Sequence, residues 1–234
     1  MGPWTHSGNW GPNLWVCDGP VAKDLLVVPY PTRMTIARLA DGGLWITSPV
    51  RSSMERLEAI TSLGPVRHLV APTPRHHWRL EPWHALFPEA ELWSCALGPF
   101  TLGRRSLPAT RLGDQTPPGW AAEIDQARYR GLGFEEVAFF HRPSRTLLLE
   151  DVLQSHGFHR GRPLVNGLIR VGGIAHPGGV PRDIRAITRR REARAWLEKV
   201  LSWDFGRVVM AHGPVVEDGA RVLVERAFSW LRPS

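Results

Sequence analysis

Short apolar runs alternate with amphipathic segments along this chain, and the pattern predicts a layered α/β protein. Several runs are apolar at nearly every position, which is typical of strands buried on both faces. The predicted strands are 25–28, 34–39, 44–47, 66–70, 91–95, 123–130, 137–141, 146–149 and 207–210. A four-residue turn at 142–145 joins two of them into a hairpin.

Apolar residues at helical spacing predict four main helices, at 53–63, 81–87, 191–203 and 219–231. The first follows Ser52, with Glu55 three residues later, which is a capping-box pattern. The strand 66–70 then follows directly, as in the strand–helix–strand unit of α/β folds. We expect one domain over 1–234, with a Trp-, Gly- and Pro-rich segment at 1–20. An irregular insertion is expected at 152–187, with a short helix near 164–171.

The formal net charge of +7 at pH 7 raises the question of nucleic-acid binding. Only Lys23 and Lys199 are lysines among the 29 basic residues, and the arginines are dispersed. The densest group, at 182–194, has no aromatic residue before Trp196 for stacking on bases. We therefore expect no specific nucleic-acid recognition.

Hydropathy and cysteine usage narrow the class of protein further. No run approaches the roughly 20 apolar residues of a membrane span, and the first ten residues lack a secretory pattern. A cytoplasmic protein with no membrane contact is expected. Cys17 and Cys95 have no CxxC spacing, so they are expected to be buried as small hydrophobic residues rather than to bind zinc.

Metal-ligating side chains follow three of the predicted strands. His76 and His77 come after 66–70, Asp151 after 146–149, and His212 after 207–210. Sites in α/β folds gather at the carboxyl ends of strands. Structural alternatives exist for each: neighbouring histidines point in different directions, Asp151 suits a helix cap, and His212 suits a buried position before a turn. Their shared placement at strand ends favours a site.

The order of the elements and these three segments resemble the metallo-β-lactamase superfamily, and its DUF4336 branch in particular. The matching stretches are 14–21, 31–35, 44–50, 64–77, 140–151 and 203–216. The resemblance implies an α/β fold of the four-layer αβ/βα sandwich type, with a site at one edge between the two sheets. Ser48-Pro49 stands where the superfamily usually has an Asp-Thr or Asp-Ser turn.

One of the superfamily's two metal sites is lost as a unit. When the motif His-x-His-x-Asp-His is laid on this sequence, its first two histidines fall on Pro72 and Pro74. Its Asp falls on His76, and its last histidine is retained as His77. Proline has no ligand atom, and the later single histidine has no counterpart near 132–133.

The other site keeps a ligand-competent residue at every position: His76, His77, Asp151 and His212. The resemblance therefore implies one divalent metal ion, with zinc as the default and iron or manganese as alternatives. We expect His77, Asp151 and His212 to converge, with donor atoms about 3–4 Å apart. His76 is expected to reach the same point by a rotamer change.

Two functions from different classes fit this pattern. The first is a mononuclear metal-dependent hydrolase of an ester, thioester or phosphoester, with Glu135 or Glu136 as general base. The alternative is a non-catalytic module that binds a small ligand or a protein in the same cleft. The identity of the small-molecule substrate and the oligomeric state do not follow from the sequence.

Overall fold

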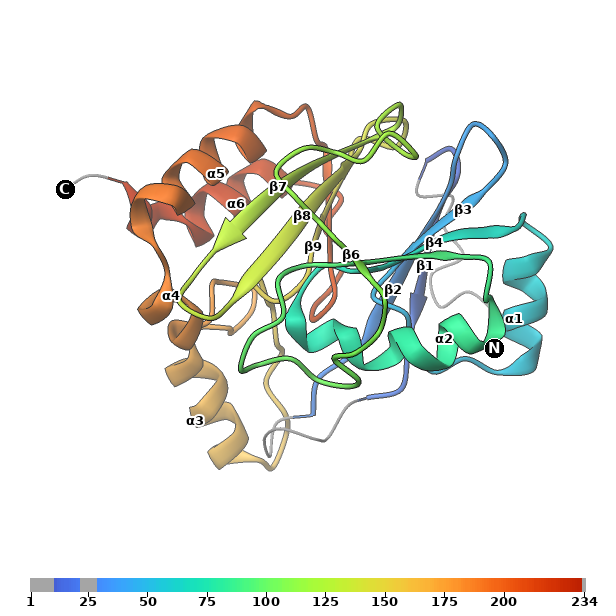
Figure 1. Ribbon diagram of the computed structural model, residues 1–234. Helices are drawn as coiled ribbons and strands as arrows, with labels where there is room; N and C mark the ends of the chain where they lie inside the picture. Colours follow the sequence, from blue (N-terminus) through green and yellow to red (C-terminus); the bar gives the residue numbers. More distant parts are fainter. Residues whose placement is uncertain (1–10, 22–28, 233–234) are drawn as a thin grey trace.

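The computed structural model describes residues 11–21 and 29–232, and it contains two β-sheets flanked by helices (Figure 1). The strands are β1 (Leu14–Asp18), β2 (Arg33–Arg38), β3 (Leu44–Thr47), β4 (Val66–Ala71), β5 (Glu91–Ser94), β6 (Thr110–Arg111), β7 (Ile124–Arg130), β8 (Glu135–His141), β9 (Thr146–Leu149) and β10 (Arg207–Met210). The helices are α1 (Met54–Thr61), α2 (Leu80–Leu86), α3 (Pro163–Gly172), α4 (Arg182–Ile187), α5 (Arg190–Ser202) and α6 (Ala220–Ala227), with 3-10 turns η1 (Pro74–Arg79) and η2 (Ser229–Leu231).

Both sheets are mixed. The first has the order β1-β2-β3-β4-β5-β6, antiparallel from β1 to β3 and parallel from β3 to β6. The second has the order β10-β9-β8-β7, in which only β10 and β9 are parallel. The first sheet is therefore extended by crossover helices, and the second by the 135–149 hairpin.

Three separate apolar clusters show the layering of the molecule. One lies between the sheets and includes Trp45, Val70 and Phe139. A second joins the outer face of the first sheet to α1 and α2, and a third joins the second sheet to α5 and α6. Figure 1 shows these helix pairs on opposite sides of the molecule. The predicted four-layer αβ/βα sandwich is confirmed.

The structure differs from the sequence prediction at several elements. The α1 cap is Ser53 rather than Ser52, because its hydroxyl accepts from the backbone N–H of Arg56. The apolar stripe 219–231 is not one helix, since α6 ends at Ala227 and η2 follows. β1, β6 and α4 were not predicted. The predicted strand 25–28 lies outside the described residues.

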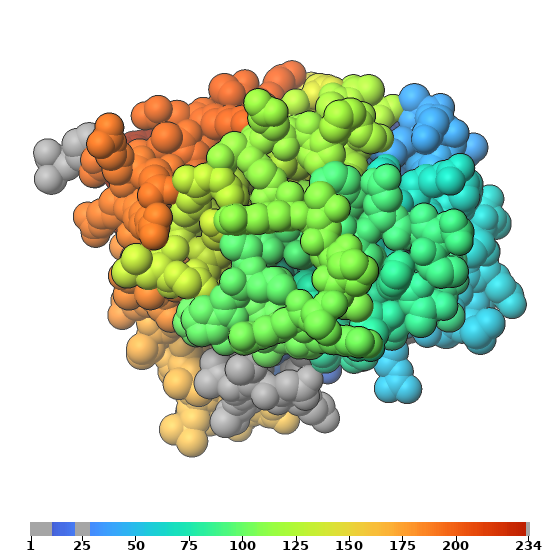
Figure 2. Space-filling view, in the orientation of Figure 1, coloured from blue at the N-terminus to red at the C-terminus, as the bar shows by residue number. Residues whose placement is uncertain are grey.

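The segment between β5 and β7, where the sequence predicts no strand or helix, runs across the front of the molecule (green in Figures 1 and 2). It is anchored to both sheets. Leu112 donates its N–H to the Ser94 carbonyl oxygen, at 2.8 Å. The Gln126 side-chain amide donates to the carbonyl oxygens of Gly113 and Gln115, both at 2.9 Å. Because Leu112 is also part of the inter-sheet cluster, this segment closes one side of the sandwich.

The arginine-rich stretch 182–194 is largely engaged within the protein. Arg194 donates to the Leu231 carbonyl oxygen, and Arg189 pairs with Glu192. Arg185 and Arg190 lie over the ring of Trp230, at 4.8 and 5.6 Å from its centroid. No helix among the described residues has both the length and the apolar character to cross a bilayer.

We expect both cysteine thiols to be unreactive in the folded protein. Cys17 and Cys95 are buried and free, and burial raises the pKa of Cys17 to about 12 and that of Cys95 further. The attacking species is the thiolate, so little of it forms near pH 8. Ellman's reagent should titrate two thiols per chain in guanidinium and almost none without it. Rapid reaction of the native protein would contradict this burial.

Candidate metal centre

Three side chains from distant parts of the chain meet at one edge between the sheets. One ligand atom from each of His76, Asp151 and His212 lies within 4.8 Å of the other two. Nε2 of His212 is 3.4 Å from Nε2 of His76 and 3.3 Å from Oδ1 of Asp151. Their side chains are 11, 2 and 6% exposed, in that order along the chain.

Strand register explains why these residues converge. β9 and β10 are parallel, and Leu149 pairs with Met210 at their last positions. The chain therefore continues from both strands at the same edge of the sheet, two residues before Asp151 and His212. η1 follows β4 in the facing sheet, and Thr73 caps it by accepting from the Arg75 N–H. The hydrogen bond from the Val137 N–H to the Pro72 carbonyl oxygen, at 2.9 Å, fixes the start of η1 against the second sheet.

The outer nitrogen of each site histidine is held by an acceptor. Nδ1 of His212 is 2.7 Å from the Pro31 carbonyl oxygen, which can only accept, so Nδ1 carries the proton. Nδ1 of His76 is 2.7 Å from the Ser48 hydroxyl and 3.3 Å from the Glu150 carboxylate. Both rings therefore direct Nε2 at each other. This is how histidine ligands are oriented around a metal by outer partners.

The side chains of Thr73 and Arg75 orient the carboxylate of Asp151. The Thr73 hydroxyl donates to Oδ2 at 2.7 Å, which leaves Oδ1 facing His212. Arg75 lies 3.8 Å from Oδ1 and also contacts Asp183, at 3.4 Å. The alternative role of Asp151 as a helix cap is not seen, because no helix begins at Val152.

The charges of the group are strongly coupled. Burial by itself lowers the pKa of His76, but the carboxylates of Asp151 and Glu150 outweigh burial and raise the pKa to about 9. Burial by itself raises the pKa of Asp151, but its cationic neighbours outweigh it and lower the pKa. The cluster therefore favours a positive charge between these groups, which a proton or a metal cation supplies.

The structure differs from the sequence prediction in which of the two adjacent histidines belongs to the ligand group. His76, expected to join only by a rotamer change, already belongs to the group, whereas His77 does not. His77 is 1% exposed, and neither ring nitrogen has a hydrogen-bond partner among the described residues. Burial lowers the pKa of His77, so the ring is neutral. Successive residues of a 3-10 turn point about 120° apart, so only one of the two can face Asp151.

The two candidate bases are occupied elsewhere. Glu136 is fully buried, and its carboxylate accepts from the backbone N–H groups of Glu150, Asp151 and Val152, at 2.7–2.9 Å. It therefore positions the loop that carries Asp151. Glu135 contacts Arg111 and Arg128 and accepts from the Ala96 N–H. Glu150, which was not singled out as a site residue, is the carboxylate that contacts Nδ1 of His76, at 3.3 Å.

Comparison with known proteins places the chain in a family. Residues 13–157 match the family model described as Domain of unknown function (DUF4336). The chain belongs to the DUF4336 family. No curated protein matches this DUF4336 chain.

Several solved structures share the fold of this DUF4336 protein. A putative diflavin flavoprotein from Nostoc has a TM-score of 0.60 at 11% identity, covering 94% of this chain and 92% of its own. A metallo-β-lactamase family protein from Thermus thermophilus has a TM-score of 0.58 at 14% identity, covering 94% and 79%. A metallo-β-lactamase of Pseudomonas aeruginosa in a mono-zinc form has a TM-score of 0.57 at 8% identity, covering 94% and 92%. The DUF4336 chain is thus a divergent branch of the metallo-β-lactamase fold.

The prolines of the DUF4336 chain have structural roles at the lost motif positions. Pro72 and Pro74 are both buried. The Pro72 carbonyl oxygen binds the Val137 N–H, and the Pro74 carbonyl oxygen binds the Leu102 N–H, at 3.0 Å. These two positions now connect η1 to its surroundings through the backbone.

Most of the residues that contact and orient the ligand group were not predicted from the sequence. Ser48 was noted only as an altered turn, yet it has a φ of +54° and bonds His76. Thr73 and Arg75 lie inside the quoted motif and were not assigned roles. Pro31 acts through its carbonyl oxygen, for which a side-chain pattern gives no signal.

Proposed function

We propose that this chain is a mononuclear metal-dependent hydrolase, with His76, Asp151 and His212 as its metal ligands. The observation that carries the proposal is the spacing of their donor atoms, 3.3 and 3.4 Å. Tetrahedral zinc with bonds of about 2.0–2.2 Å separates its ligand atoms by about 3.3–3.6 Å. In the absence of a metal, a proton between Nε2 of His76 and Nε2 of His212 occupies the same place, in keeping with the raised pKa of His76.

The ligand set favours zinc, with iron or manganese as alternatives. Two imidazoles and one carboxylate leave a coordination position open, as catalytic zinc sites do. The same set with open positions also suits ferrous iron. The likeness to a metallo-β-lactamase in a mono-zinc form supports the view that this fold can hold a single ion. Pro72 and Pro74 stand where the superfamily motif has histidine ligands, and this replacement argues against a second ion.

A divalent ion bound here would activate water and polarise the oxygen of an ester, thioester or phosphoester. The protein's own residues prepare the site. The Pro31 carbonyl oxygen keeps the His212 proton on Nδ1, and Ser48 and Glu150 do the same for His76. Thr73 binds Oδ2 of Asp151 and leaves Oδ1 directed at His212. Glu135 and Glu136, the two bases expected from the sequence, are engaged in other contacts, and Glu150 is engaged with Nδ1 of His76.

The alternative is a binding module without catalysis, and the replaced motif positions favour it. A protein that is no longer selected for catalysis would be free to lose one half of a two-metal site. The two proposals differ in metal content and in turnover. A module that only binds a ligand in the cleft needs neither a metal ion nor turnover.

Elemental analysis tests the metal proposal. Protein expressed with added zinc, iron and manganese should contain about one ion per chain, and His212→Ala should contain almost none. His84→Ala is the matched control, because His84 lies on α2 and does not belong to the group. The His212→Ala protein should keep the fold, as judged by circular dichroism. Metal-free wild-type protein after supplemented expression would overturn the proposal.

Turnover separates the hydrolase from the binding module. The metal-loaded protein is assayed against p-nitrophenyl acetate, a phenyl thioester and bis-p-nitrophenyl phosphate, before and after removal of the metal by a chelator. We expect hydrolysis of at least one compound that disappears with the metal and returns on its addition. Stoichiometric metal with no turnover of any of them would favour the binding module.

A further inference from the structure

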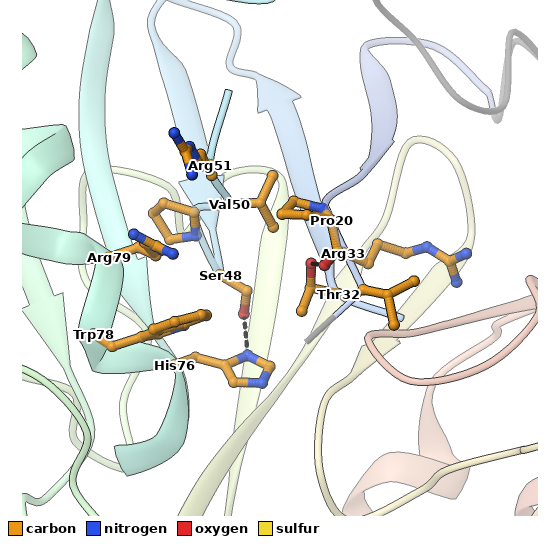
Figure 3. A pocket seen from close by; sticks show the side chains of 11 residues that line it. Pro20, Thr32, Arg33, Ser48, Val50, Arg51, His76, Trp78 and Arg79 are labelled. Atoms are coloured by element: carbon orange, nitrogen blue, oxygen red, sulfur yellow. Dashed lines mark hydrogen bonds between the residues drawn. The ribbon is translucent and has the colours of Figure 1, made fainter. Parts of the chain in front are cut away.

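A small pocket adjoins the metal centre on the side of the first sheet. Its volume is about 220 Å³, and His76, Ser48, Thr32, Arg51, Trp78 and Arg79 are among the residues that line it. Figure 3 shows Arg51 and Arg79 on one side of the pocket and Thr32 with Pro20 on the other, with the Ser48–His76 hydrogen bond at its base. His76 is therefore shared between the pocket and the metal centre.

Among the residues that the structure describes, the lining is rich in positive charge and has no acidic member. Arg33, Arg51 and Arg79 all contribute to it. Arg33 is neutralised by structural contacts. Its Nε binds Asp18 at 2.7 Å, and its Nη1 donates to the carbonyl oxygens of Met210 and Gly213, at 2.8 and 2.6 Å. Arg33 therefore joins the two sheets, and its charge is not available to a ligand.

Arg51 and Arg79 have no such compensation. Neither has a carboxylate partner within residues 11–21 and 29–232. The Arg79 guanidinium lies over the Trp78 ring, with its central carbon 4.0 Å from the ring centroid. The Arg79 Nε is buried without a hydrogen-bond partner in the same part of the chain. A buried donor left unsatisfied costs about 1–3 kcal/mol, and none of the described residues offsets that cost at Arg79.

We propose that this pocket binds the phosphate monoester group of a small-molecule substrate. Two uncompensated guanidinium groups carry a charge of about +2, and a phosphate monoester carries about −1.5 to −2 near pH 7. Guanidinium groups match phosphate oxygens in geometry as well as in charge. A carboxylate supplies half of that charge and fewer oxygens. The pocket is smaller than the roughly 300–1,000 Å³ of common ligand sites, so it accommodates the charged end of a molecule rather than the whole of it.

The position of His76 connects this recognition site to the chemistry. Its Nδ1 side faces Ser48 at the pocket, and its Nε2 faces His212 in the metal centre. A molecule held by its phosphate in the pocket therefore lies next to His76, one of the three proposed metal ligands. That the phosphate belongs to a substrate rests on the proposed function. That the pocket binds phosphate depends only on Arg51 and Arg79.

Calorimetric titration with inorganic phosphate tests the pocket. The full-length, metal-loaded protein is compared with Arg51→Gln, Arg79→Gln and, as a control, Arg226→Gln, whose exposed arginine lies on α6. Each pocket variant should lose about tenfold or more in phosphate affinity, while the control should match the wild type. Sodium acetate at the same ionic strength should bind at least about tenfold more weakly than phosphate.

His212→Ala separates this inference from the proposed function, because phosphate can also bind a metal directly. Phosphate binding that persists in His212→Ala and still depends on Arg51 and Arg79 supports the pocket, even if the wild type holds no metal. Equal phosphate affinity in wild type, Arg51→Gln and Arg79→Gln would overturn the inference while leaving the metal proposal intact. Acetate binding as tight as phosphate binding would overturn the choice of a phosphate group.

Discussion

Replacing His76 with Leu is expected to abolish stoichiometric metal binding, whereas the same change at the adjacent His77 should leave it intact. His76 presents Nε2 to His212 at 3.4 Å, and His77 lies outside the ligand group. Loss of an outer partner of a metal ligand costs about 10–100-fold in affinity. Loss of the ligand itself should cost more. Competition titration with a fluorescent zinc chelator measures both variants against the wild type.

The stability of the two variants provides a second measurement. His77 is buried with both ring nitrogens unpartnered within the described part of the chain. Exchange of such a group for an apolar one of similar size is nearly neutral or stabilising. We therefore expect the His77→Leu protein to unfold in urea, with chelator present, within about 1 kcal/mol of the wild type. If His77→Leu loses the metal and His76→Leu retains it, the ligand assignment is wrong.

The layered fold was predictable because burial leaves a clear mark on the sequence. The apolar runs at β4, β9 and β10 are buried in a core between layers, and the structure has them close to the predicted bounds. β1 escaped notice because Leu14–Asp18 directly follows a Gly- and Pro-rich stretch. β6 has two exposed residues, so no apolar pattern exists to reveal it.

The site was predictable only in part. Its location followed from strand ends, because parallel β9 and β10 must deliver Asp151 and His212 to one edge. The choice between His76 and His77 depended on the direction of a 3-10 turn, which the residues 74–79 do not disclose. The supporting contacts depend on tertiary structure. The pairing of His212 with the Pro31 carbonyl oxygen spans 181 positions, and that of Arg33 with Gly213 spans 180.

Replacing Glu136 with Gln is expected to destabilise the protein by about 2–4 kcal/mol. Both oxygens of this buried carboxyl group accept, one from the Glu150 N–H and the other from the N–H groups of Asp151 and Val152. Burial and the charge of Asp151 raise the pKa of Glu136 to about 8, against the opposing effect of these donors. Glutamine retains one acceptor and places an NH₂ group against a backbone donor. At least one buried N–H is then left without a partner.

The adjacent Glu135→Gln is the matched control, because it makes the same side-chain substitution one residue away. Glu135 is 15% exposed, and its arginine contacts are 3.4 and 3.7 Å long. The pair with Arg111, which is 61% exposed, contributes about 0–1 kcal/mol, and Arg128 keeps its closer contact with Asp114, at 2.6 Å. Urea unfolding with chelator present should therefore separate the two variants clearly. Glu136→Gln should also weaken zinc binding, since the Glu136 contacts hold the backbone of Asp151, and Glu135→Gln should not. Equal stability of the two variants would show that Glu136 does not anchor the 150–152 loop, and the position of Asp151 would then need another physical cause.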